Sequence, residues 1–246
     1  MSIPDVVAFL SLVAFGAAVQ SITGFAMGLI IMGGVGAFGL ADIGFGAAVV
    51  SIVSATNTTI ALRHTHKFVD RRTWLWIIAG LLPMTVAGVF LLHALSGDFY
   101  QWLRVFLGVV IISAGTLLML KPTPFARKSG RVLILAMGSI GGLIGGMYGA
   151  GGAPLAWLMY RQPMDVNRIR ATLLATFFVS TSSRIVTITA TGHFSREMLY
   201  VSLASIPVVI LVTLGATRIA HKVPDKAVRR AVFTLLVVLG ASLILR

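Results

Sequence analysis

Two polar or glycine-rich interruptions of apolar segments hold the residues best suited to bind a ligand. The first is residues 20–25 (QSITGF), and the second is residues 149–154 (GAGGAP). A helix that begins just after such a break directs its unpaired N–H groups, and the positive end of its dipole, toward the break. The backbone can also approach a ligand closely at four glycines in these runs, Gly24, Gly149, Gly151 and Gly152. This geometry favours an anion; the alternative is that the glycines only let helices pack.

Four further glycines precede the second break, at Gly138, Gly141, Gly142 and Gly145. Their small-xxx-small spacing is typical of close contacts between membrane helices. We therefore interpret these four as packing residues.

Polar side chains also lie in the middle of two apolar segments. Within residues 43–62, one amide and four hydroxyls cluster at positions 54–59, namely Asn57 with Ser54, Thr56, Thr58 and Thr59. The equivalent part of residues 169–190 contains Ser180, Thr181, Ser182 and Ser183. This density favours a polar site, with Asn57, Thr181 and Ser182 as candidate ligands. The alternative is that the hydroxyls bond back to their own helices.

Arg184 lies within the apolar segment 169–190, away from both of its ends. An arginine at the centre of a membrane helix costs about 2.5–3.5 kcal/mol on insertion scales, and no acidic residue lies within a helical turn of it. Its guanidinium could bind the oxygens of an anionic substrate. The alternative is that the side chain extends to the outer headgroups.

The whole chain is too apolar for a soluble protein. Of its 246 residues, 57% are hydrophobic and 11% are charged, and the mean hydropathy is +0.97. Soluble domains are about 45–50% apolar and about 25% charged. The net charge of +13 is explained by basic cytoplasmic loops that face anionic lipid headgroups. We expect an integral membrane protein that contacts membrane lipids and binds no nucleic acid.

Apolar segments predict an all-α, polytopic transmembrane protein. They cover residues 4–39, 43–62, 74–93, 102–120, 131–160, 169–190, 198–217 and 229–245. After the second break, about nine apolar residues remain before Arg161, and nine helical residues extend about 13 Å, less than half of the hydrocarbon core. The segment 131–160 should therefore enter the membrane, break near its middle and return to the same side.

Basic residues gather in four loops, which hold sixteen of the twenty Lys and Arg residues: 63–73, 121–131, 161–170 and 218–230. If both broken segments return to the side they came from, these loops share one face. The positive-inside rule then places them in the cytoplasm and both termini outside the plasma membrane.

The sequence also repeats at an offset of 125 positions, which superposes Gly24 on Gly149, Asn57 on Ser182 and Gly115 on Gly240. The halves would have opposite orientations, as in the inverted repeats of secondary transporters. We predict repeat 1 at residues 1–120, a cytoplasmic linker at 121–130 and repeat 2 at 131–246. Each repeat would contain one broken, re-entrant helix and three spanning helices.

No arrangement of side chains suggests catalysis, a metal site or a cofactor. The five histidines lie near predicted interfaces without metal-binding spacing, and the chain contains no cysteine. The Gly-x-Ser-x-Gly motif and paired carboxylates of hydrolases are also missing. We expect no enzyme, no metal and no cofactor.

The runs at residues 140–155 (IGGLIGGMYGAGGAPL) and 20–30 (QSITGFAMGLI) resemble the sulfite exporter TauE/SafE family of bacterial membrane transporters. The resemblance covers essentially the whole chain. It implies a plasma-membrane carrier of sulfur-containing anions such as sulfite, thiosulfate or sulfonates. The binding region that it implies is Gly24–Phe25 and Gly149–Gly152, with neighbouring hydroxyls such as Thr23.

These observations together predict a secondary transporter that works by alternating access of two inverted repeats. Its partner is a small anionic substrate, and a homo-oligomer is compatible with the sequence. The alternatives are an anion channel, a carrier of a non-sulfur organic anion and an intramembrane enzyme.

Overall fold

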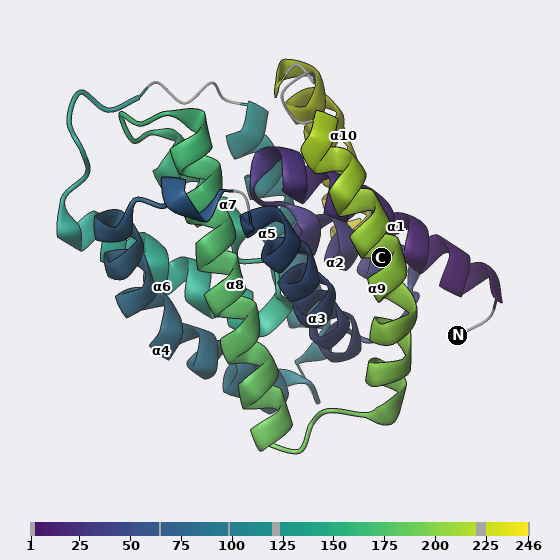
Figure 1. Cartoon of the computed structure of the whole chain (residues 1–246). Helices are drawn as coiled ribbons and strands as arrows, with labels where there is room; N and C mark the ends of the chain where they lie inside the picture. Colours follow the sequence, from purple (N-terminus) through teal and green to yellow (C-terminus); the bar gives the residue numbers. More distant parts are fainter. Residues whose placement is uncertain (1–2, 64, 98, 120–123, 220–224, 246) are drawn as a thin grey trace.

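The computed structural model describes residues 3–63, 65–97, 99–119, 124–219 and 225–245, and all regular structure in these ranges is helical (Figure 1). The first half contains α1 (Ile3–Thr23), α2 (Met27–Phe38), α3 (Ile43–Leu62), the 3-10 turn η1 (His66–Phe68), α4 (Arg71–Leu95) and α5 (Tyr100–Met119). The second half contains α6 (Arg131–Tyr148), α7 (Gly152–Tyr160), α8 (Val166–Ala190), α9 (Arg196–Ile219) and α10 (Asp225–Leu245). The predicted all-α fold is confirmed.

Both predicted helix breaks are present. The chain leaves α1 at Gly24, whose φ is +84°, and it leaves α6 at Gly149, whose φ is +65°. These left-handed conformations suit glycine, which has no Cβ to clash. Ala26, with a φ of +85°, is strained in the same region, where a non-glycine residue costs on the order of 1–3 kcal/mol. The backbone therefore turns sharply at two points inside the molecule.

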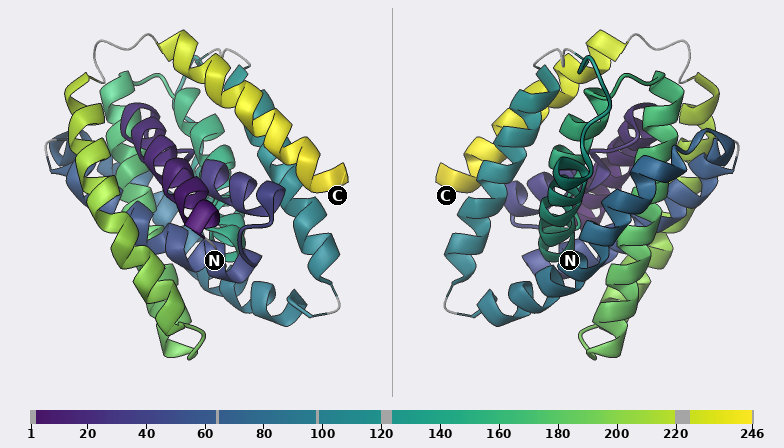
Figure 2. Two further views of the ribbon diagram at one scale, coloured as in Figure 1. Left: turned by 90° about the vertical axis from the view of Figure 1, so that its right-hand side faces the viewer. Right: turned by 90° about the vertical axis from the view of Figure 1, so that its left-hand side faces the viewer.

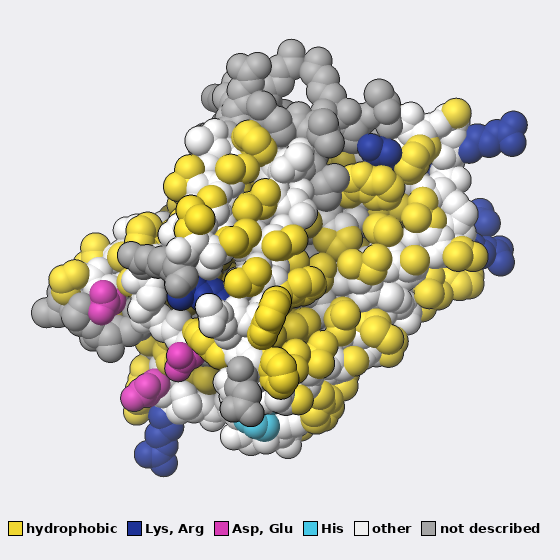
Figure 3. Space-filling model, turned by 180° about the vertical axis from the view of Figure 1, so that it is seen from behind, with side chains coloured by type: hydrophobic (Ala, Val, Ile, Leu, Met, Phe, Trp, Pro, Cys, Tyr) yellow, Lys and Arg dark blue, Asp and Glu magenta, His cyan; other side chains and the backbone are white. Residues whose placement is uncertain are grey.

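Within the described residues, six helices are long and apolar enough to cross a membrane, namely α1, α3, α4, α6, α8 and α9. The described apolar parts of α2, α5 and α10 are shorter. The face seen in Figure 3 carries a broad hydrophobic surface, with most of its Lys and Arg side chains near the margins. This distribution agrees with a multi-pass membrane protein.

Three pairs of helices in the two halves begin 125 residues apart. In the first half, α2, α4 and α5 begin at Met27, Arg71 and Tyr100. In the second half, α7, α9 and α10 begin 125 residues later, at Gly152, Arg196 and Asp225. The offset found in the sequence is therefore also the offset between the starts of these three pairs of helices.

The contacts between helices also relate the two halves. When each helix is exchanged for its equivalent in the other half, one contact becomes another. Helix α1 contacts α9 and α6 contacts α4, whereas α2 contacts α10 and α7 contacts α5. The two helices α3 and α8 contact each other, and α5 and α10 cross at one side of the bundle, opposite α9 (Figure 2). These are the contacts that exchanging two related halves would produce. The opposite orientation of the halves in a membrane stays a prediction.

Helices α4 and α6 approach each other closely through glycines. A Cβ added to Gly138, Gly142 or Gly146 of α6 would collide with carbonyl oxygens of α4, those of Ile77, Leu81 and Thr85. The packing interpretation is thus confirmed for Gly138 and Gly142. Gly141 and Gly145 instead face the second break, where both lie against Gly151.

We expect Gly142→Ala to destabilise the protein, because the new methyl group collides with the Leu81 carbonyl and overpacking costs about 1–3 kcal/mol. Gly215→Ala is the matched control, since a Cβ there meets nothing within 4 Å and alanine favours a helix. Thermal unfolding in detergent should show a lower midpoint for Gly142→Ala alone. Equal midpoints for the two variants would contradict this account of the α4–α6 contact.

Candidate functional site

The two helix breaks touch each other inside the protein. A Cβ on Gly28, in the first turn of α2, would collide with the carbonyl group of Gly149. A Cβ on Gly152, the first residue of α7, would lie 3.3 Å from the ring of Phe25. The amino ends of the two short helices therefore meet, and each meets the break of the other half.

A small cavity of about 10 Å³ lies where the breaks meet. It is lined by Gln20, Phe25, Ala26, Met27, Gly28, Leu29, Ser54, Gly149, Ala150, Gly152 and Phe177. The lining includes the first turn of α2 and the first residue of α7, where backbone N–H groups have no partner within their own helix. Such groups, together with the positive ends of two helix dipoles, can bind an anion.

Three of the predicted site residues line this cavity, and three others from the breaks pack beside it. Phe25, Gly149 and Gly152 form part of the lining. Gly24 lies against the backbone of Arg170 and the side chain of Leu173 in α8, and a Cβ on Gly151 would collide with the Gly141 carbonyl. The Thr23 hydroxyl donates to the Val19 carbonyl at 2.8 Å.

Asn57 holds α1 and α9 to α3. Its side chain is fully buried, and its Nδ2 lies 3.0 Å from Ser21 Oγ, 3.2 Å from the Ala17 carbonyl oxygen and 2.7 Å from Thr213 Oγ1. Its Oδ1 is buried and has no hydrogen-bond partner among the described residues. Asn57 is therefore a structural link with one unused acceptor, about one helical turn along α3 from Ser54, which lines the cavity.

Arg184 links α8 to the end of α6 and to α3. It is 1% exposed, so the side chain does not extend to the headgroups. Nε donates to the Gly146 carbonyl at 2.7 Å, and Nη1 donates to Ser51 Oγ at 2.9 Å and to the Ala47 carbonyl. Because Gly146 lies in the last turn of α6, the guanidinium stabilises the negative end of that helix. Nη2 is buried without a partner among the described residues.

The hydroxyl clusters largely bond to their own helices. Thr56, Thr58 and Thr59 donate to carbonyls of α3, and Thr181 donates to the Phe177 carbonyl at 2.7 Å. Ser182 is half-buried on α8. The alternative of back-bonding therefore holds for these threonines.

Gln20, Ser54 and Phe177 line the cavity, although the sequence did not single them out as ligands. The Gln20 amide donates from Nε2 to Ser54 Oγ at 3.3 Å, which joins α1 to α3. Gln20 could have been found as an isolated amide in an apolar helix, and Ser54 belongs to the hydroxyl cluster already noted. For Phe177 the sequence contains no signal.

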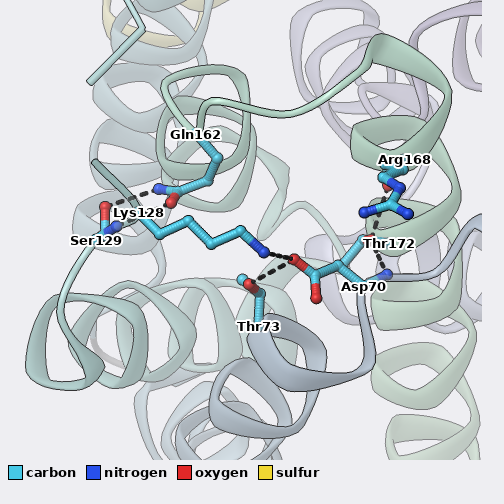
Figure 4. Close-up of polar contacts among 7 residues, drawn as sticks. All are labelled: Asp70, Thr73, Lys128, Ser129, Gln162, Arg168 and Thr172. Atoms are coloured by element: carbon cyan, nitrogen blue, oxygen red, sulfur yellow. Dashed lines mark hydrogen bonds and ion pairs between the residues drawn. The ribbon is translucent and has the colours of Figure 1, made fainter. Parts of the chain in front are cut away.

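A second polar cluster lies at one end of the bundle, where the linker meets both halves (Figure 4). Lys128 Nζ is 2.6 Å from Asp70 Oδ2, and the Asp70 N–H donates to Thr172 Oγ1 at 3.0 Å. Ser129 and Gln162 exchange two hydrogen bonds, of 3.0 and 2.7 Å. Three of the four basic loops therefore lie together, as expected if they share one face of a membrane.

Burial raises the pKa of Asp70, but the Lys128 ammonium and the Thr73 hydroxyl lower it by more. The pKa of this carboxyl therefore lies below its usual value. Asp70 stays ionised at neutral pH and holds the linker.

Comparisons with known proteins agree with this architecture. Residues 8–243 match the family model described as "Sulfite exporter TauE/SafE". The chain is 35% identical over 235 residues to a protein of Cupriavidus necator named "Probable sulfite/organosulfonate exporter TauE", and the alignment covers 96% of this chain and 92% of that protein. No solved structure matches the chain.

We expect Arg184→Ala to lower the free energy of unfolding by about 2–4 kcal/mol, since it leaves the Gly146 carbonyl without its donor and opens a cavity. Arg196→Ala is the control, because Arg196 is exposed at the start of α9. Chemical unfolding in detergent measures the difference. If both variants were as stable as the parent, Arg184 would not be a link between helices.

The pH dependence of stability should reveal the Asp70–Lys128 ion pair. Because the pKa of Asp70 is lowered in the folded protein, its contribution is present above the usual pKa of 3.8 and is lost as the pH falls through the folded value. Lys128 is 49% exposed, so Asp70→Asn should cost less than about 1 kcal/mol at pH 7. Once the pH lies below the folded pKa of Asp70, the variant and the parent should unfold alike. A difference that persisted there would contradict the ion-pair explanation.

Proposed function

The chain belongs to the sulfite exporter TauE/SafE family, and from that premise we propose that it is a secondary transporter of small sulfur-containing anions. Family membership makes it a multi-pass membrane transporter and not an enzyme, as predicted. The proposed substrates are sulfite, thiosulfate or an organosulfonate. The name of the Cupriavidus necator relative supports sulfite and organosulfonates.

One observation carries the proposal: the amino ends of α2 and α7 meet at a shared cavity. The N–H groups of the first turns and the two helix dipoles favour negative charge at this point. The Gln20 amide and the Ser54 hydroxyl, which line the same cavity, add side-chain donors for the oxygens of sulfite or a sulfonate. No buried carboxylate among the described cavity residues opposes the charge.

The predicted site residues then fall into two groups. Phe25, Gly149 and Gly152 contact the anion directly. The second group holds the two breaks and the adjacent helices in place around it, and consists of Thr23, Gly24, Asn57, Gly151, Thr181, Ser182 and Arg184.

The size of the cavity favours alternating access over a permanently open pore. A space of about 10 Å³ holds about one water molecule, so a sulfur oxyanion fits only if the two breaks separate. Each break belongs to a different half, and a movement of one half against the other would separate them. In this proposal the basic loops face the cytoplasm and both termini lie outside.

Exchange of labelled sulfite in proteoliposomes tests the proposal. Ser54→Val removes a donor from the cavity and should weaken sulfite binding about tenfold, since a hydrogen bond to a charged group contributes about 1.5–3 kcal/mol. Thr59→Val is the matched control, because Thr59 is exposed on the same helix and bonds to the Ala55 carbonyl. An unchanged affinity of Ser54→Val for sulfite would contradict the proposal that sulfite binds at this cavity.

Two other outcomes would replace the proposed function. An electrical current without exchange of labelled sulfite would indicate an anion channel. Stronger thermal stabilisation by acetate or phosphate than by any sulfur anion would indicate a carrier of another substrate, because a preferred ligand stabilises the folded protein by mass action.

A further inference from the structure

A groove opens on the side of the bundle between α5, α6 and α7, away from the cavity at the breaks. Its volume is about 470 Å³. Apolar side chains line it almost throughout, among them Phe106 and Val109 of α5, Ile140 of α6 and Trp157 of α7. Phe106, Val109 and Ile140 are each 45–47% exposed. In a bilayer such a surface is covered by acyl chains or by another protein.

The groove follows α7 from its amino end to its last turn. Ala153 and Pro154, at the amino end of α7, line one part, and Trp157 lines another. Because α7 begins at the break and ends beside the linker, the groove runs from the middle of the molecule toward the end that carries the basic loops.

A cation lies at the outer end of this groove. The Arg161 guanidinium is 4.5 Å from the centre of the Trp157 ring and 5.6 Å from that of Phe125. Phe125 is fixed there, because its N–H donates to the Arg161 carbonyl at 2.7 Å. Arg161 Nε is buried without a hydrogen-bond partner among the described residues, and Arg161 forms no ion pair with them. The guanidinium is thus held in place while part of its donor capacity is unused.

The apolar groove is complementary to an acyl chain, and the fixed cation is complementary to the phosphate of a phospholipid. We propose that an anionic phospholipid of the cytoplasmic leaflet binds here, with an acyl chain between α5, α6 and α7 and its phosphate on Arg161. The positive charge near the groove favours an anionic lipid over a second copy of the chain. Arg127 and Arg131 are exposed on the adjacent segment, and they would repel the same two arginines of a second copy. The lipid also contacts α7 directly, the helix that carries half of the proposed anion site.

Quenching of Trp157 fluorescence by brominated lipids tests the proposal. The full chain with Trp74, Trp76 and Trp102 changed to Phe keeps Trp157 as its one tryptophan, and it is placed in phosphatidylcholine bilayers. Phosphatidylglycerol with brominated acyl chains should quench Trp157 with about fivefold higher apparent affinity than brominated phosphatidylcholine, about the factor expected for one basic residue near an anionic surface.

Arg161→Gln should abolish the preference for phosphatidylglycerol, whereas Arg127→Gln, the matched control in the adjacent linker, should preserve it. Equal quenching by the two lipids in the parent, or a preference that survives in Arg161→Gln, would overturn the proposal. Absence of quenching by either lipid would mean that a second copy of the chain covers the groove, which also overturns it. Loss of the preference on adding 10 mM inorganic phosphate would assign Arg161 to free phosphate instead.

Discussion

Backbone groups at a helix break inside a membrane find no water to bond, so each must find a partner within the protein. Two helices of this chain, α1 and α6, end inside the bundle and leave their last carbonyls without partners in the helix. The tight turns satisfy part of this need, since the N–H groups of Gly24 and Gly149 return to the carbonyls of Gln20 and Gly145. The remaining carbonyls depend on donors from other helices.

The two halves supply those donors with different residues. The Thr23 carbonyl at the end of α1 accepts the Tyr160 hydroxyl at 2.8 Å, from the last residue of α7. The Gly146 carbonyl near the end of α6 accepts Arg184 from α8. Asn57 of α3 bonds to Ser21, which is equivalent to Gly146 under the 125-residue offset. The central helices α3 and α8 therefore hold the equivalent ends of both broken helices.

This division of roles leaves the amino ends of α2 and α7 for the anion that we propose. The negative end of α6 is stabilised by Arg184, which donates to the Gly146 carbonyl. The positive ends of α2 and α7 meet with no carboxylate among the described residues that line the cavity. An anion is the partner that such a pair of helix ends favours. The chemistry of the family and the geometry of the breaks therefore point to the same class of substrate.

The existence and bounds of the helices, and both breaks, could be predicted from the sequence. These features depend on local properties: apolar segments of membrane length, glycine where φ is positive, and an amide or a proline where a segment is interrupted. The repeat offset of 125 residues was equally visible, because it superposes glycines such as Gly24 on Gly149 and Gly115 on Gly240, and three of the helix pairs begin at the same offset.

Only the tertiary structure decided which residues face one another. It placed Gln20, Ser54 and Phe177 at the cavity, and it gave Arg184 two helix carbonyls and a hydroxyl as partners. A soluble helix marks its buried face by a contrast between apolar and polar residues. Membrane helices of this composition are apolar on nearly every side, so the sequence does not distinguish the face that meets lipid from the face that meets a neighbouring helix.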